Sequence, residues 1–117
     1  MRRAQGALKE ADVLKRAGHW NACAGRLSYA CFFAAKALLL GHAVESDRHS
    51  SVRRLLNRQA IGEGGISSDQ ARFYDELSQF GDKADHEALA ELDEALVTPW
   101  ISQATQFVQR VEHLLNR

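Results

Sequence analysis

The chain has few of the residues that interrupt helices or cross-link a fold. Its 117 residues include one proline, Pro99, and two cysteines, Cys23 and Cys31. Scarce proline and few β-branched runs favour helices over strands. The two cysteines are eight residues apart on one expected helix, about 12 Å along its axis and beyond the roughly 7 Å limit for a disulfide. We therefore expect reduced thiols and a cytoplasmic protein.

The chain also shows no charged-then-apolar leader, and we expect no apolar run that reaches the roughly 18 residues that a bilayer requires. These absences predict a protein without a membrane association. A length of 117 residues predicts one domain, residues 1–117, long enough to bury a hydrophobic core of its own.

The chain also has no net charge, but its positive and negative residues are unevenly distributed. Residues 1–58 hold 11 Lys and Arg against 4 Asp and Glu, and residues 59–117 hold 4 against 11. Helices from the two halves would neutralise one another if they packed side by side. The alternative is a basic face that binds an anionic ligand. Zero net charge argues against general coating of nucleic acid.

The chain does contain an apolar segment at 26–41. Its apolar residues follow the helical repeat and cover nearly every side of the expected helix. Its apolar or small residues follow the helical repeat at Leu27, Ala30, Cys31, Ala34, Ala37, Leu38 and Gly41, and Phe33, Ala35 and Leu39 widen the stripe. A helix of this kind needs cover on several sides, either from its own chain or from a second copy.

Helical patterns and caps divide the rest of the chain. We expect helices at 4–17, 21–40 and 50–57, a helix that opens with a Ser67–Gln70 capping box, and a final helix capped by Thr98 with Pro99 in its first turn. The first helix should stop near Gly18, and Gly81 marks a weak point in the fourth. The predicted fold is therefore all-α: an antiparallel four-helix bundle with one or two additional short helices.

Familiar catalytic and metal motifs are absent. The glycines at 62, 64 and 65 lack the strand and helix that flank a phosphate-binding loop, and the five histidines are too scattered for a metal cage. We therefore predict no metal and no cofactor. One polar cluster remains, at residues 82–87, directly after an apolar helical segment.

Several segments of the chain occur in the order typical of a known family. The apolar helix contains a Tyr-Ala-x-Phe-x-Ala-Ala-x-Ala-Leu-Leu pattern that begins at Tyr29, and His49 stands where a histidine begins the next helix. A glycine-containing loop, the segment 73–77 and then Lys-Ala-Asp-His at 83–86 follow. Together these segments, which cover nearly the whole chain, resemble the small prokaryotic HEPN-domain proteins.

The resemblance implies a helical bundle that forms a homodimer and is often encoded beside a small nucleotidyltransferase, the two acting as toxin and antitoxin. Active members are metal-independent ribonucleases whose motif is arginine, four to six intervening residues, and histidine, with the motifs of two subunits meeting across the dimer. Arginine can hold a phosphate with its planar fork, and histidine can exchange a proton with the reacting oxygen.

The motif arginine is missing from this chain. Counting back from His86, the positions that would carry it are Gly81, Phe80 and Gln79. Relatives outside the toxin branch carry an Arg-x₄-Asp-Tyr-like sequence here, of which this chain keeps only Asp85. The tyrosine that accepts AMP in some toxins is also absent, because position 88 is alanine.

Two cations are candidates to replace the arginine. Lys83 is close to His86 in sequence but offers a point charge rather than a fork, and Arg72 is about fourteen residues away. Both histidines also have an interpretation without a functional role. His86 would then be a solvated or Asp-paired histidine, and His49 a locally hydrogen-bonded residue at the helix start.

Two functional hypotheses follow. The first is a degenerate, non-catalytic dimeric module that binds a nucleotidyltransferase-like partner, or a nucleotide or RNA ligand, with Lys83, Asp85, His86 and His49 as the candidate site. The second is a ribonuclease toxin with His86 as general acid and base. A helical bundle without a small-molecule site is a third interpretation.

Overall fold

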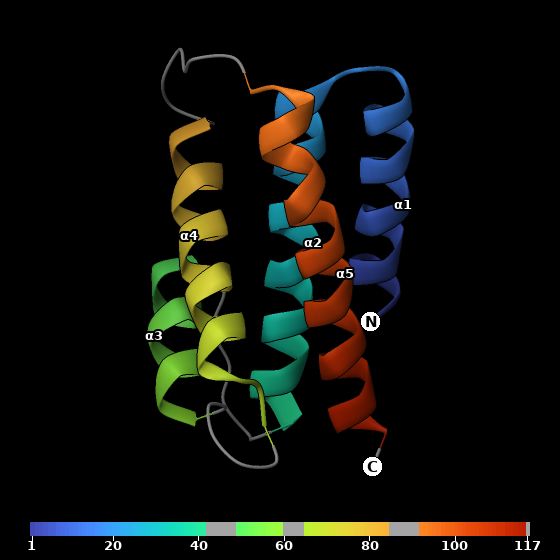
Figure 1. Ribbon diagram of the computed structural model, residues 1–117. Helices are drawn as coiled ribbons and strands as arrows, with labels where there is room; N and C mark the ends of the chain where they lie inside the picture. The colour runs from blue at the N-terminus through green and yellow to red at the C-terminus, as the bar shows by residue number, and fades with distance from the viewer. Residues whose placement is uncertain (42–48, 60–64, 85–91, 117) are drawn as a thin grey trace.

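The computed structural model describes residues 1–41, 49–59, 65–84 and 92–116, and in these ranges the chain is helical and has no strand (Figure 1). The helices are α1 (Arg2–Arg16), α2 (Trp20–Gly41), α3 (His49–Gln59), α4 (Ser68–Ala84) and α5 (Glu94–Leu115). The four long helices run in alternating directions, and α3 is the short additional helix (Figure 1). The predicted all-α bundle is confirmed.

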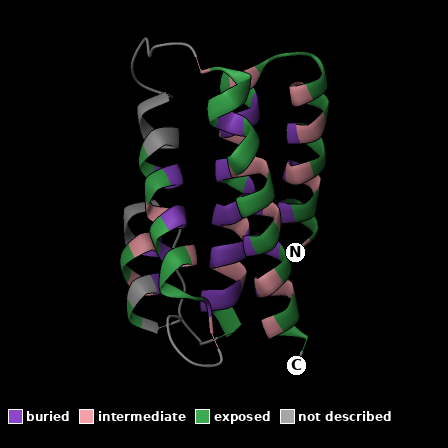
Figure 2. Cartoon of the chain, viewed as in Figure 1, coloured by how far each residue is buried: buried purple, intermediate pink, exposed green. Residues whose placement is uncertain are grey.

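Helix α2 lies in the middle of the bundle and packs against each of the other four helices. Figure 2 shows its buried residues along most of its length. Eleven of its residues are buried, among them Leu27, Cys31, Ala34 and Leu38. The cover that its apolar sequence requires is therefore supplied by its own chain, and a second copy is not needed for that purpose.

The length of α2 corrects one expectation. At 22 residues, α2 is long and apolar enough to cross a membrane by length and composition, whereas the sequence was expected to contain no such segment. However, 61% of its apolar window is buried inside the protein, the pattern of the core helix of a folded domain. The small residues at Ala30, Ala34 and Ala35 allow neighbouring helices to approach closely enough to bury it.

The turn between α1 and α2 confirms the predicted stop near Gly18. Gly18 has φ of 77°, in the left-handed region. Its N–H donates to the carbonyl of Lys15 at 3.0 Å, and the N–H of His19 donates to the carbonyl of Leu14 at 2.9 Å. These two bonds form a Schellman motif, which ends α1 and reverses the chain into α2.

The start of α5 was predicted wrongly. The helix begins at Glu94, and Asp93 is its N-cap, with its carboxylate accepting a hydrogen bond from the N–H of Leu96 at 2.9 Å. Thr98 and Pro99 therefore lie inside the helix. The reason is tertiary: Val97 is fully buried, so an earlier start adds an apolar residue to the core, which offsets the one backbone hydrogen bond that Pro99 cannot donate.

Candidate functional site

Two of the predicted site residues lie on helices that the structure describes. His49 is the first residue of α3, as the sequence predicted, and Lys83 lies in the last turn of α4. Asp85 and His86 lie outside the described residues. Gly81 was expected to weaken α4, but the helix continues through it to Ala84. The position where the family motif places arginine is therefore a helical position close to the end of α4.

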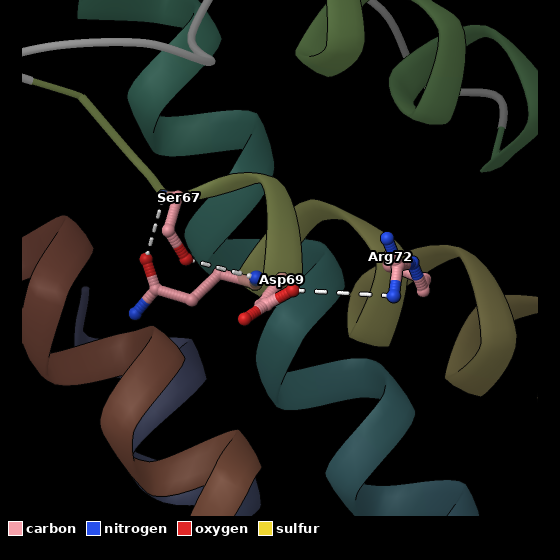
Figure 3. Close-up of polar contacts among 4 residues, drawn as sticks. Ser67, Asp69 and Arg72 are labelled. Atoms are coloured by element: carbon pink, nitrogen blue, oxygen red, sulfur yellow. Dashed lines mark hydrogen bonds and ion pairs between the residues drawn. The ribbon is translucent and has the colours of Figure 1, made fainter.

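Arg72 is held at the other end of α4. Its Nη1 lies 4.0 Å from Oδ1 of Asp69, in the first turns of the helix, and both side chains are largely exposed (Figure 3). From Arg72 to Ala84 the helix rises about 18 Å. Because an arginine side chain is much shorter than this distance, Arg72 cannot supply a phosphate fork beside the end of α4 within one subunit.

The start of α4 is fixed by the capping box that the sequence predicted. The N–H of Gln70 donates to Oγ of Ser67, and the N–H of Ser67 donates to Oε1 of Gln70, both at 3.0 Å (Figure 3). These reciprocal bonds satisfy two backbone donors at the N-terminus of the helix. The helix that carries Gly81 and Lys83 thus has a defined register from its first residue.

A groove next to this cap was not anticipated from the sequence. It has a volume of about 510 Å³ and lies between the start of α4 and the middle of α5, lined by Gly65, Ser67, Asp69, Gln70, Phe73, Gln103, Gln106 and Arg110. Nε and Nη2 of Arg110 donate to the carbonyl oxygen of Gly65 at 3.1 and 3.0 Å. The fork of Arg110 is thus occupied by the backbone, which makes it a structural rather than an anion-binding group here.

The polar interior around Tyr74 was also missed. Tyr74 is a fully buried residue of α4, and its ring stacks on Phe107 with 5.6 Å between centroids. Its hydroxyl is buried and has no hydrogen-bond partner of good geometry among the described residues, although the buried Ser78 hydroxyl is nearby, one turn further along. Burial raises the pKa of Tyr74 far above its usual value, and the nearby cation Arg53 of α3 opposes this shift. A neutral phenol in this environment is a core residue.

The two thiols are not activated. Burial raises the pKa of both Cys23 and Cys31. A nucleophilic cysteine needs the opposite shift, toward the thiolate. Neither cysteine is in a disulfide, as expected from their spacing. Within the part of the chain that the structure describes, no three His, Cys, Asp or Glu side chains gather to hold a metal ion.

Comparison with known proteins agrees with this architecture. A family model described as the HEPN domain matches residues 1–114. The chain belongs to the HEPN family. A protein of Thermotoga maritima named UPF0332 protein is 29% identical over 115 residues, which cover 98% of this chain and 87% of the relative. A UPF0332 protein of Archaeoglobus fulgidus is 26% identical over 117 residues, covering 100% of this chain and 93% of the relative.

Membership in the HEPN family confirms the resemblance drawn from Tyr29, His49 and the segments that follow them. The match extends over nearly the whole chain, α4 included. The assignment of the motif position to Gly81 rests on the resemblance.

Proposed function

We propose that this HEPN protein is a non-catalytic binding module rather than a ribonuclease. It acts as a homodimer and binds RNA or a nucleotide-bearing ligand, or a nucleotidyltransferase-like partner. The single observation that supports this most strongly is the position of the one arginine on α4. The motif position is Gly81, and the helix's own arginine, Arg72, is ion-paired about 18 Å from the far end of the helix.

The chemistry explains why that position matters. Cleavage of RNA at the ribose hydroxyl develops negative charge on the phosphate, and a bidentate guanidinium stabilises this charge at fixed geometry. Lys83 follows Gly81 by two residues, but its ammonium has no planar fork. A site with Lys83, Asp85 and His86 but no arginine is suited to holding an anion more than to stabilising a transition state.

Dimerisation is proposed from the family resemblance and from exposed apolar side chains. Leu40 at the end of α2 is 62% exposed, and Leu115 at the end of α5, which lies close to the neighbouring Gly41, is 37% exposed. The apolar core of α2 is already covered, so a dimer of this chain would be formed by such surface residues and not by the buried face of the second helix. In a dimer the two α4 helices would each contribute one copy of the candidate site.

The alternative function is a ribonuclease toxin with His86 as general acid and base. The observation in its favour is that Lys83 lies three residues before His86, so a cation and a titratable imidazole are close together in sequence. In that case the arginine would have to come from a second subunit or be replaced by Lys83.

A cleavage assay separates the two functions. The purified full chain and a His86→Ala variant are incubated with structured and unstructured RNA in the presence of EDTA. We expect both proteins to be inert to the same extent. A Gly81→Arg variant restores the family spacing at a helical position and shows whether the assay can detect an active site in this scaffold.

Two results would reject the proposal. Cleavage by the unmodified chain that is lost in His86→Ala would establish the ribonuclease. The proposed binding module would be rejected if the protein sediments as a monomer at micromolar concentration and binds neither RNA nor nucleotide. Circular dichroism of each variant ensures that loss of helix is not mistaken for loss of function.

A further inference from the structure

A row of cations and aromatic rings runs along the α1–α2 side of the protein. We name Arg3, Arg26, Tyr29, Phe33 and Lys36 the cation–aromatic strip. On α2 the strip residues are spaced three, four and three apart, which places them on one face of the helix over about 15 Å. Arg3 joins them from α1, which packs along α2.

The contacts within the strip are continuous. Cζ of Arg26 lies 4.9 Å from the centroid of the Tyr29 ring. The Tyr29 and Phe33 rings stack with 6.0 Å between centroids and 30° between planes. Cζ of Arg3 then lies 5.7 Å from the Phe33 centroid. Two guanidinium groups are therefore held against one pair of stacked rings.

Lys36 extends the strip toward the end of α2. Its Nζ lies 5.4 Å from the centroid of the buried Phe32 ring. The Phe32 and Phe33 rings are 5.9 Å apart. The strip is thus anchored in the core at this end and is positioned by packing, not only by surface contacts.

Core packing does not explain why the strip is at the surface. The buried face of α2 is formed by other residues, such as Leu27 and Ala34, and Tyr29 is 38% exposed. A cation beside a ring at an exposed site contributes little to folding. Phe33 packs against the core, whereas Tyr29 does not belong to it. A large aromatic side chain outside the core, with arginines beside it, is typical of binding surfaces.

The charge of the two helices defines the kind of ligand. Together α1 and α2 carry seven Lys and Arg against Glu10 and Asp12. Each of these acids already faces an arginine: Asp12 is 2.8 Å from Arg16, and Glu10 is 3.5 Å from Arg26. An excess of five positive charges remains over the two helices, and three of the seven cations belong to the strip, so this side of the protein favours an anionic ligand.

The rings distinguish one polyanion from another. A guanidinium that lies over a ring keeps its in-plane N–H donors available for the oxygens of a phosphate. Exposed aromatic rings offer surfaces on which unpaired bases stack. Single-stranded nucleic acid presents phosphates and unpaired bases in alternation, whereas a double helix keeps its bases stacked inside and an acidic protein surface offers no bases.

We propose that the cation–aromatic strip binds single-stranded RNA. Arg26 and Arg3 contact backbone phosphates. The Tyr29 ring is stacked on Phe33 and lies under the Arg26 guanidinium, so a base stacks on Tyr29 by taking the place of Arg26, whose guanidinium turns to a phosphate. The choice of RNA over DNA rests on the proposed function, and the location of the site rests on the strip alone. The Glu10 carboxylate, which is exposed and 3.5 Å from Arg26, competes with the phosphate for the guanidinium.

The test is fluorescence anisotropy with a labelled oligouridylate of about twelve nucleotides, a length within the range that single-strand binding folds cover. The full chain is titrated at low and at physiological salt, beside Tyr29→Leu and Arg26→Gln. Tyr29→Leu keeps apolar cover but removes the π-face, and we expect it to weaken binding by about fivefold or more. Arg26→Gln should also reduce the slope of log K against log salt by about 0.7.

The matched control is Arg72→Gln on α4. It removes the same charge from an exposed, ion-paired arginine outside the strip, and we expect its affinity to remain within about twofold of the unmodified protein. Glu10→Gln changes binding in the opposite direction: removal of the competing carboxylate should tighten it by about twofold to fivefold. This gain cannot come from a misfolded variant.

Several results would overturn the proposal. One is an equal loss of affinity in Arg72→Gln and Arg26→Gln, because that result indicates unspecific charge. Others are tighter binding of an RNA duplex of the same length, no binding by the unmodified chain, or saturation of the strip by an acidic peptide only. Equal affinity for the matching single-stranded DNA would overturn the choice of RNA. RNA cleavage in EDTA would reject the non-catalytic function and leave this binding site intact, so the two failures are distinguishable.

Discussion

The guanidinium of Arg110 on α5 donates two hydrogen bonds to the carbonyl oxygen of Gly65, at 3.1 and 3.0 Å, and thereby ties the residues before α4 to the last helix. Gly65 and Arg110 are 45 residues apart in the chain. The contact fixes the start of α4 relative to α5 in a region where direct packing between these two helices is sparse.

Substitution of Arg110 should therefore destabilise the fold. Hydrogen bonds to a charged group contribute about 1.5–3 kcal/mol, and Arg110→Lys cannot make both bonds, so we expect the free energy of unfolding to fall by about 1–2 kcal/mol. Urea denaturation followed by circular dichroism measures it. Arg72→Lys, at an exposed ion pair, is the control and should change stability by less than about 0.5 kcal/mol. Equal effects at the two sites would contradict the role given to Arg110.

The Ser67–Gln70 capping box predicts a coupled pair of substitutions. Ser67→Ala removes the hydroxyl that accepts from the N–H of Gln70 and should cost about 1 kcal/mol of stability. Gln70→Ala removes the reciprocal bond. Because both bonds belong to one motif, the double variant should lose less than the two single losses added together. Strict additivity in urea denaturation would show that the bonds act independently; Ser68→Ala serves as the control.

The corrected start of α5 leads to a direct comparison. Asp93→Ala removes the N-cap carboxylate that accepts from the N–H of Leu96, and we expect a loss of about 1 kcal/mol. Thr98→Ala changes a residue inside the helix and should cost less than about 0.5 kcal/mol. Thermal unfolding of the two variants shows which substitution causes the larger loss of stability. A larger loss at Thr98 would restore the helix start predicted from the sequence.

The buried Tyr74 gives a pH dependence whose sign is fixed. Its pKa is raised in the folded state by burial, so the folded protein keeps a proton that the unfolded chain releases above about pH 10. Stability from this group is complete below the unfolded pKa and falls as the pH rises above it, by up to about 1.4 kcal/mol per pH unit. The buried thiol of Cys31 acts in the same direction, from a lower starting pH, because burial raises its pKa as well.

Tyr74→Phe isolates the tyrosine contribution. The variant keeps the stacked ring but removes a hydroxyl that lacks a hydrogen-bond partner of good geometry among the described residues, so stability at neutral pH should be unchanged or slightly higher. Above about pH 10 the variant should lose stability less steeply than the unmodified protein. Parallel urea titrations across this range measure the difference, and identical slopes would show that the Tyr74 phenol ionises normally in the fold.

The sequence was most informative where one local signal determines the structure. Gly18 ends α1 because the left-handed conformation suits glycine, and Ser67 opens α4 because Gln70 stands three residues later. The resemblance to the family placed His49 at the start of α3. The two caps depend on contacts within one or two helical turns, so the sequence contains the information that they need.

Prediction was weaker where local signals compete. Pro99 with a preceding threonine is a good helix start by itself, yet Asp93 provides an equally good cap and Val97 gains burial only if the helix begins there. The groove beside Arg110 depends on a contact over 45 residues, and the stack of Arg3 on Phe33 joins two helices. No local pattern indicates either contact, although the i, i+3 and i+4 spacing of Arg26, Tyr29 and Phe33 is visible in the sequence.

By itself, the sequence determined that this HEPN protein is a helical bundle without the motif arginine, because helical periodicity, capping residues and the identity of position 81 are local properties. The tertiary structure decided which surfaces are buried: α2 receives its cover from its own chain, and its cation–aromatic face is left outside. The reason is that burial depends on which helices approach one another, and that choice is made by the summed packing of the whole core rather than by any one segment.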